Sequence, residues 1–198
     1  MFFDEIDKSN KLIKAVHHDL SVLGYRVGCK ALGLIHKLVT GPLWRKLSAE
    51  KTALDMTSHY QHMVECFTKW CNNCDAFLKG EESLFKDLVH KDDLYHSLIK
   101  PFEQDEAMVK PLLEIIFSGF LSVSNRMLHD HLHGEYKNPS AEVSVESASV
   151  PTTNAASERD FGMLDRLMKL KPKALDLVYE GMITVSYTHL TLPTIYSV

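Results

Sequence analysis

Two pairs of residues with metal-binding side chains stand at regular spacings in this sequence. Cys71 and Cys74 are separated by two residues, which is the ligand spacing of half a zinc site. His129 and His133 are four residues apart, so on a helix both imidazoles would lie on one face. Thiolate sulfur and imidazole nitrogen are ligands that Zn²⁺ prefers. We expect these four residues to be candidate ligands of a structural zinc if two antiparallel helices bring the pairs together.

The same side chains also fit a simpler interpretation, in which they have no metal. Cys74 falls on an apolar seam and Cys71 stands beside Val64 and Phe67, so both thiols can act as small buried apolar groups. Histidines near the end of a helix are favoured by its macrodipole. The packed-core interpretation is the commoner one for a single CxxC, and both stay open.

A carboxylate is the third chemical candidate. Glu158 follows Ser157, which can cap a helix, so the carboxylate would lie in the first turn. The helix dipole alone favours a carboxylate there by about 0.3–1 kcal/mol, which would explain Glu158 without any function. The functional alternative is a ligand for Mg²⁺ or Mn²⁺ in phosphoryl transfer, which needs several clustered carboxylates. Nearby Arg159, Lys169 and Lys171 could contact phosphates or form a solvated basic face.

The elements that would position these residues are predicted to be helical. Two long seams have apolar residues alternately four and three apart, which is typical of packed helices. Shorter helices are predicted from Phe2 to about Gly24, from Cys29 to the turn before Pro42, and over residues 81–99. The first seam is Met56, Tyr60, Met63, Phe67, Trp70, Cys74 and Phe77, ended by Gly80, and the second is Val109, Leu113, Ile116, Phe120, Val123 and Met127.

Composition excludes several classes of protein. The chain has 198 residues, 45% of them hydrophobic and 24% charged, which is ordinary for a globular protein. A net charge of −4 provides no global attraction to nucleic acid, so DNA contacts would need local basic patches. We expect no membrane span, no secretory leader and a reducing compartment.

A family resemblance lies in residues 150–161, where a linker of small residues leads into the predicted helix of Glu158. The run Ser157-Glu158-Arg159-Asp160-Phe161 resembles the block that carries the last catalytic acid of hAT-type DNA transposases. Gly162 stands where that family has serine. The all-helical run before the block is similar to the family's long helical insertion.

The resemblance implies an RNase H-like catalytic core, DNA as partner and a nuclear location. It also implies Mg²⁺ or Mn²⁺ as cofactor of the intact parent, that is, of a longer transposase from which this chain would derive. In the family two further aspartates lie on strands before the insertion, and no strand-borne aspartate precedes Phe2 here. The chain is therefore expected to be a fragment, inactive and without a cofactor when alone. The expected fold is mainly α: a bundle of two long antiparallel helices plus shorter ones, with the terminal helices of an incomplete RNase H-like core.

The predicted layout has four parts. Residues 1–134 form the helical domain, residues 135–154 a linker with one possible strand at 142–145, and residues 155–183 the C-terminal helices, the last from Pro172 to Met182. Residues 184–198 resemble translated sequencing-adapter read-through and are expected to lie outside the fold. The alternative function is a helical protein-interaction module, for which a homo-oligomer and a structural zinc both stay open. No small-molecule substrate is expected.

Overall fold

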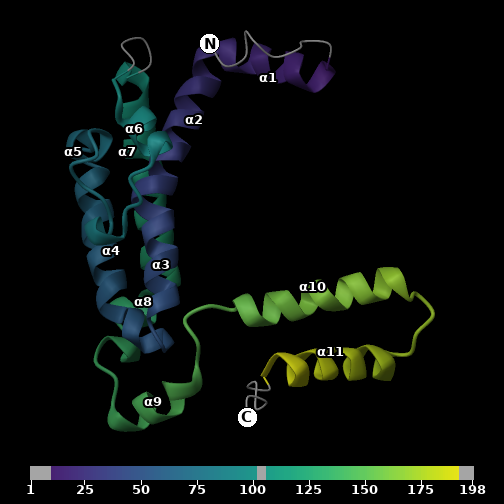
Figure 1. Ribbon diagram of the computed structural model, residues 1–198. Helices are drawn as coiled ribbons and strands as arrows, with labels where there is room; N and C mark the ends of the chain where they lie inside the picture. Colours follow the sequence, from purple (N-terminus) through teal and green to yellow (C-terminus); the bar gives the residue numbers. More distant parts are fainter. Residues whose placement is uncertain (1–9, 102–105, 192–198) are drawn as a thin grey trace, which may run out of the picture. The chain divides into compact units, whose positions relative to one another are not determined.

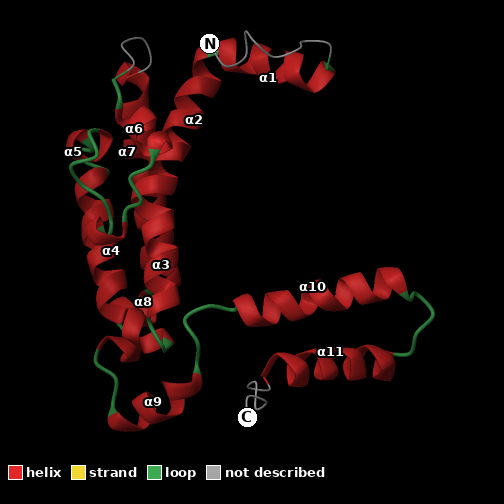
Figure 2. Ribbon diagram, in the orientation of Figure 1, coloured by secondary structure: helices red, strands yellow, loops and turns green. Residues whose placement is uncertain are grey.

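The computed structural model describes residues 10–101 and 106–191, and all of the regular structure in these residues is helical (Figures 1 and 2). The mainly α fold class is confirmed at this level. The chain divides into a first unit, Met1–Thr152, and a second unit, Thr153–Val198, which are described separately. The division falls close to the predicted start of the C-terminal helices at residue 155.

The first helices of the described chain are interrupted at residue 22 and contain a π-helical turn at residues 36–40. Asn10 caps α1 (Lys11–Ser21) by accepting a hydrogen bond from the Leu12 N–H at 2.8 Å. Val22 then adopts an extended conformation, and α2 (Leu23–Ile35) starts directly after it. The predicted single helix ending near Gly24 is therefore wrong, because the chain breaks at Val22 and then resumes as a helix.

Pro42 does not end the second helix as predicted. The π-helical turn η2 (His36–Thr40) joins α2 to α3 (Gly41–Ala49), so the helical segment continues for 27 residues from Leu23. The Gly41 N–H bonds to the His36 carbonyl, one residue further back than in an α-helix. Pro42 has no N–H to donate to Leu38, and the Leu38 carbonyl instead accepts the Leu84 N–H at 2.9 Å. A tertiary contact thus replaces the helical bond that proline removes.

The predicted long helix from Met56 to Phe77 is two helices in the structure. After η3 (Ala53–Met56), α4 (Thr57–Trp70) ends at a turn, and α5 (Asp75–Leu78) follows it. The apolar residues of the predicted seam are nevertheless buried, apart from the partly buried Tyr60. The next segment is mostly loop, with only η4 (Lys86–Leu88) and α6 (Asp93–Ile99) helical, so the prediction of a helix over residues 81–99 is correct only at its end.

The longest α-helix of the first unit is α7 (Glu106–Met127), with Pro111 inside it, followed by α8 (His129–Leu132), which ends before Gly134. Short helices η5 (Glu135–Lys137), α9 (Ala141–Glu146) and η6 (Ser147–Ser149) fill the segment predicted as a linker. The possible strand at residues 142–145 is wrong. Ser140 accepts a hydrogen bond from the Val143 N–H at 3.2 Å and thereby caps α9 as a helix.

The core of the first unit lies between α2, α4 and α7, which run side by side in Figure 1. Its centre is a set of aromatic rings from α4, α5 and α7, with neighbouring ring centroids 4.8–6.3 Å apart. These rings are Phe67, Trp70, Phe77, Phe117 and Phe120. Aromatic pairs at such distances contribute beyond the apolar area they bury.

One helix of the described chain, Ala107–Met127, is long and apolar enough to cross a membrane by length and composition. No membrane span is expected from the sequence, because the apolar run Leu112–Leu121 is short and is interrupted by Glu114. The core helix of a soluble protein meets the same criterion. Val109, Leu113 and Phe117 are fully buried in the first unit, but only 17% of the apolar stretch is buried, so packing accounts for the apolar character of one face of α7 only.

The second unit is a pair of helices, α10 (Ala155–Leu170) and α11 (Asp176–Thr191). Tyr179 is its only buried residue among those whose burial is described. The α11 helix starts later than the predicted Pro172 and runs to Thr191, past Met182 and into the predicted tail. Residues 192–198 of that tail lie outside the described residues.

Candidate functional site

The two cysteines of the predicted zinc site lie at the turn between α4 and α5. The Cys71 thiol is 3.3 Å from the Thr68 carbonyl oxygen, within its own helix end. Cys74 is completely buried, with its sulfur 3.6 Å from the carbonyl oxygen of Lys110. Burial raises the pKa of the Cys74 thiol to about 11, so it is protonated at neutral pH. This environment matches that of a core thiol.

The histidines lie at the other end of the α4–α7 pair. The rings of His129 and His133 are 5.7 Å apart and both residues are exposed. Between them, His131 turns inward, with Nδ1 2.8 Å from the Thr57 hydroxyl and its ring centroid 5.1 Å from that of Tyr60. Burial lowers the pKa of His131 and so favours its neutral form.

The structure does not bring the cysteine and histidine pairs together. Because α4 and α7 are antiparallel, Cys74 meets Lys110 at the start of α7, whereas Thr57 meets His131 beyond its end. The 14 residues of α4 separate these two ends by about 20 Å at 1.5 Å per residue. Within residues 10–101 and 106–191, no three His, Cys, Asp or Glu residues could hold a metal ion. The antiparallel packing of α4 and α7 was predicted correctly. It places Cys71 and Cys74 near the start of α7, whereas His129 and His133 follow its end.

Glu158 lies in the first turn of α10, as predicted, and its side chain is exposed. Its N–H bonds to the Asn154 carbonyl at 3.0 Å, while the Asn154 side chain makes no capping hydrogen bond. The predicted cap, Ser157, is itself inside the helix. Since the described part of the chain has no strands and no acidic cluster able to bind metal, Glu158 has no partner carboxylates there. A single carboxylate does not fit a two-cation centre, and we assign no metal-dependent step to this chain.

Two of the three candidate phosphate-binding residues have acidic neighbours. The Arg159 Nε lies 4.0 Å from an oxygen of Asp160, and Lys169 forms an i,i+4 ion pair with Asp165 at 2.7 Å. Lys171 is exposed, and its carbonyl oxygen accepts a hydrogen bond from the Tyr179 hydroxyl at 2.5 Å. Arg159 and Lys169 therefore each lie beside a carboxylate of α10, which offsets their positive charge.

One pair that the sequence analysis missed is His62 and Cys66, four residues apart on α4, with Nε2 and Sγ 3.6 Å apart. A cysteine beside a histidine can act as a nucleophile when the histidine nitrogen that faces it accepts the thiol proton. Here that nitrogen cannot accept it. The Nε2 atom is also 2.9 Å from the Leu84 carbonyl, which can only accept, so Nε2 carries a proton in that contact. Burial, assisted by nearby Glu82, raises the pKa of the Cys66 thiol to about 11. The i,i+4 spacing could have revealed the pair, but not its environment.

Comparison with known proteins gives no assignment: no family model, curated protein or solved structure matches this chain. The fold and the candidate residues define only an all-helical protein, with one buried core in its first unit and an exposed acidic helix start in its second.

Proposed function

We propose that this chain is part of a transposase-derived protein related to the hAT transposases, acting on DNA in the nucleus. In this proposal the first unit corresponds to the helical insertion, and α10 to the helix that carries the last catalytic acid. The resemblance of residues 157–161 motivates the proposal, and the position of Glu158 at an exposed helix start is compatible with it.

The observation that carries the proposal is an uncovered apolar surface beside Glu158. Phe161, one turn further along α10, is 70% exposed, and Met168, two turns beyond Phe161, is 52% exposed. A helix in an α/β core buries such a face against a sheet. The second unit contains no sheet among its described residues. The apolar face of α10 is therefore one that would pack against a sheet in an α/β core, but no such sheet is present here.

The proposal separates what this chain does from what a longer protein would do. One carboxylate cannot hold two cations, so the chain alone should not cleave DNA. In a parent that also supplies two strand-borne aspartates, Glu158 would be a third ligand for Mg²⁺ or Mn²⁺. We do not include zinc in this proposal, because the cysteine and histidine pairs lie at opposite ends of α4.

The test compares the chain with a longer protein expressed from an extended reading frame that includes the upstream segment. Both proteins are incubated, in Mg²⁺ or Mn²⁺, with labelled duplex DNA that carries the two ends of the mobile element encoding the longer protein. We expect no cleavage by the chain alone, cleavage by the longer protein, and a loss of at least about a hundredfold in Glu158→Gln. The control Glu142→Gln removes an exposed carboxylate from α9 and should leave the rate unchanged. Equal cleavage by the Glu158→Gln protein and the unaltered one would contradict the catalytic assignment.

A second candidate function, a helical interaction module that self-associates, is favoured by the outer side of α7. Met108 is 47% exposed and Ile115, seven residues later and therefore on the same face, is 69% exposed; single exposed apolar residues are common, but two along one helix face are less so. Sedimentation over a range of concentrations tests it. Association that Ile115→Glu abolishes would favour the module, and a monomer at all concentrations would exclude a homo-oligomer.

A further inference from the structure

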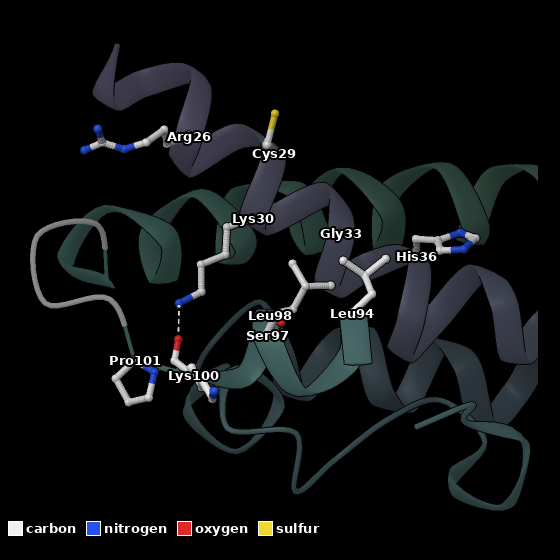
Figure 3. Close-up of a pocket in the computed structure, with 10 residues that line it drawn as sticks. All are labelled: Arg26, Cys29, Lys30, Gly33, His36, Leu94, Ser97, Leu98, Lys100 and Pro101. Atoms are coloured by element: carbon white, nitrogen blue, oxygen red, sulfur yellow. Dashed lines mark hydrogen bonds between the residues drawn. The ribbon is translucent and has the colours of Figure 1, made fainter. Parts of the chain in front are cut away.

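The α2 helix presents three sides, and two of them have neighbours within the first unit. Val27, Ala31 and Leu34 are buried in the core. A second side faces α6 across a groove of about 620 Å³ (Figure 3). The third side is exposed, and none of the candidate sites discussed above uses it.

Contacts with α6 occupy the second side of α2. A Cβ atom at Gly33 would lie 2.8 Å from a terminal methyl carbon of Leu98, so this glycine lets Leu98 pack directly over the α2 backbone. The Lys30 ammonium donates a hydrogen bond to the Lys100 carbonyl at 3.1 Å, drawn as a dashed line in Figure 3. These two contacts hold α6 against one side of α2 and leave the opposite side free.

The outer face of α2 consists of Tyr25, Cys29, Leu32 and His36. Their spacing of four, three and four residues places them in one row along the helix. Tyr25 is 58% exposed and Leu32 is 63% exposed, and the other two residues are also exposed. Figure 3 shows the Cys29 side chain pointing away from Leu98. Such a row has the spacing of the a and d positions that a coiled coil buries.

This outer face has no strongly charged group. The exposed residues from Ser21 to His36 include no Asp, Glu, Lys or Arg, although 24% of the whole chain is charged. Arg26 and Lys30, the charged residues of this stretch, are only partly exposed. Charged residues beside a coiled-coil seam decide which partner it accepts. Since none is exposed here, two copies of the face would not repel each other.

We propose that the outer face of α2 pairs with the same face of a second copy of this chain, about a two-fold axis and with the two helices antiparallel. In this arrangement Cys29 packs against Leu32 of the second copy, and Tyr25 packs against His36 of the second copy. Each layer then joins a larger side chain to a smaller one. A parallel pair would instead place Cys29 against Cys29 and leave the contact underfilled.

The pairing does not have to order α2, because the buried side of this helix already holds it in the single chain. A separate helix of this length is only marginally stable in water, so a short seam would not hold two such helices together. Here folding of the first unit meets that cost, and a short face is sufficient for weak association. We expect a dissociation constant of about 10–100 µM. This inference is independent of the transposase-derived origin, and it concerns a different helix from the association through α7.

Sedimentation equilibrium of the full chain, at concentrations below and above this value, tests the pairing. Leu32→Glu should weaken dimerisation at least about tenfold, because the paired faces would then bury two carboxylates. Ile115→Glu changes a similarly exposed residue of α7 and is the matched control, which should leave dimerisation unchanged. Circular dichroism checks that both variants are folded. A monomer at all concentrations would overturn the inference, as would a dimer that Ile115→Glu abolishes and Leu32→Glu does not.

Disulfide formation between mixed chains tests the direction of the helices. Both chains carry Cys66→Ser and Cys71→Ser, and Cys74 is buried. One chain keeps Cys29, and the other has Cys29→Ser/Leu32→Cys. With copper phenanthroline and oxygen as the oxidant, the mixed disulfide should form faster than the bond between two Cys29 thiols. A faster bond between two Cys29 thiols would overturn the antiparallel arrangement.

Discussion

At the scale of single residues, the first unit is organised by its aromatic core and a few fixed polar contacts. Trp70 donates its indole N–H to Glu82 at 2.9 Å, and the same carboxylate pairs with Lys69. The hydrogen bond from Lys69, followed by that from Trp70, lowers the pKa of Glu82. A buried indole therefore has its polar atom satisfied, and the ring can pack among its neighbours without a desolvation penalty.

Phe117 is expected to be the most sensitive of these core positions. It is fully buried, and its ring centroid lies 4.9 Å from that of Phe77 and 5.1 Å from that of Trp70. Phe117→Ala should lower the free energy of unfolding by about 3–5 kcal/mol, because the rings around the cavity cannot collapse into it. Urea denaturation of the full chain measures this. Ile115→Ala, on the exposed side of the same helix, should change the free energy of unfolding by less than about 1 kcal/mol. Similar losses of stability in both variants would show that Phe117 is not in the packed core.

Asp92 should give the first unit part of its acid sensitivity. Its carboxylate accepts hydrogen bonds from the Lys37 ammonium at 2.6 Å and the Tyr95 N–H at 2.9 Å, and these contacts lower its pKa to about 2. Because the folded pKa is below the unfolded one, the stabilisation is present above about pH 4 and is lost as the pH falls toward 2. Asp92→Asn should thus be less stable than the unaltered protein at pH 7.

The difference between Asp92→Asn and the unaltered protein should shrink between pH 4 and pH 2, as followed by urea unfolding at each pH. Asp93→Asn is the matched control, because it removes the neighbouring carboxylate at the start of the same helix without removing the Lys37 pair. If the difference between Asp92→Asn and the unaltered protein stays constant down to pH 2, this ion pair is not the cause.

At the scale of elements, the positions of helix breaks are set by contacts between helices. The turn after α4 gives α5 a new direction and places Phe77 against Trp70 and Phe117. Gly80 then closes α5 with a φ of +70°, a conformation that side chains with a Cβ rarely adopt. Its N–H bonds to the Phe77 carbonyl at 2.9 Å, and α6 packs directly over it.

Gly80→Ala and Gly119→Ala should have opposite effects. At Gly80 a Cβ would lie within 3 Å of the Tyr95 hydroxyl and of Ile99, and the left-handed backbone alone costs about 1–2 kcal/mol. At Gly119, inside α7, a Cβ would meet nothing within 4 Å, and alanine should stabilise the helix by about 0.5–1 kcal/mol. Thermal and urea unfolding measure both variants. A stabilised Gly80→Ala protein would show that this turn is not left-handed.

At the scale of the whole molecule, the two units differ in how many of their apolar side chains are buried. The first unit has an extended core over α2, α4, α5 and α7, and its C-terminal end is fixed by hydrogen bonds from Ala53 to Val150 at 3.0 Å and from Thr152 to Leu47 at 2.7 Å. Apart from Tyr179, no residue of the second unit with described burial is buried. Helices of this length are only marginally stable in water without packing.

Hydrogen exchange should therefore distinguish the two units. Amides of α4 and α7 should be protected by at least about a thousandfold more than those of α10 and α11, because a packed core opens only with a cost of several kcal/mol. Exchange followed by mass spectrometry of peptides measures this in the full chain. Equal protection in both units would mean that the apolar side of α10 is covered in solution, and the proposed missing layer would then be unnecessary.

The sequence was sufficient to predict helices where the apolar spacing is long and regular. The seam from Met56 to Phe77 correctly identifies buried residues, because spacings of four and three select one face of a helix whether or not the helix is continuous. On α7 the same reasoning was partly wrong. Val109 and Leu113 are buried as predicted, but Phe117 replaces Ile116 as the next fully buried residue, and Val123 and Met127 are exposed. The face that a helix buries depends on the position of its partner, which periodicity does not specify.

The candidate sites show the same limit. The sequence correctly places Glu158 at the start of a helix, since capping and charge preferences are local. It could not show that the Cys71 pair and the His129 pair would lie at opposite ends of α4, because spacing along the chain says nothing about which helix ends meet.

What the sequence alone determined is thus the helical class of the protein, the apolar residues available for a core and the local chemistry of Glu158. The tertiary structure decided the π-helical turn at residues 36–40, the break after Trp70 and the groove between α2 and α6. Each of these depends on residues far apart in the chain, such as Leu38 with Leu84 and Lys30 with Lys100. Local preferences are set by neighbouring residues, whereas grooves and breaks depend on which distant backbone and side-chain groups satisfy one another in the packed chain.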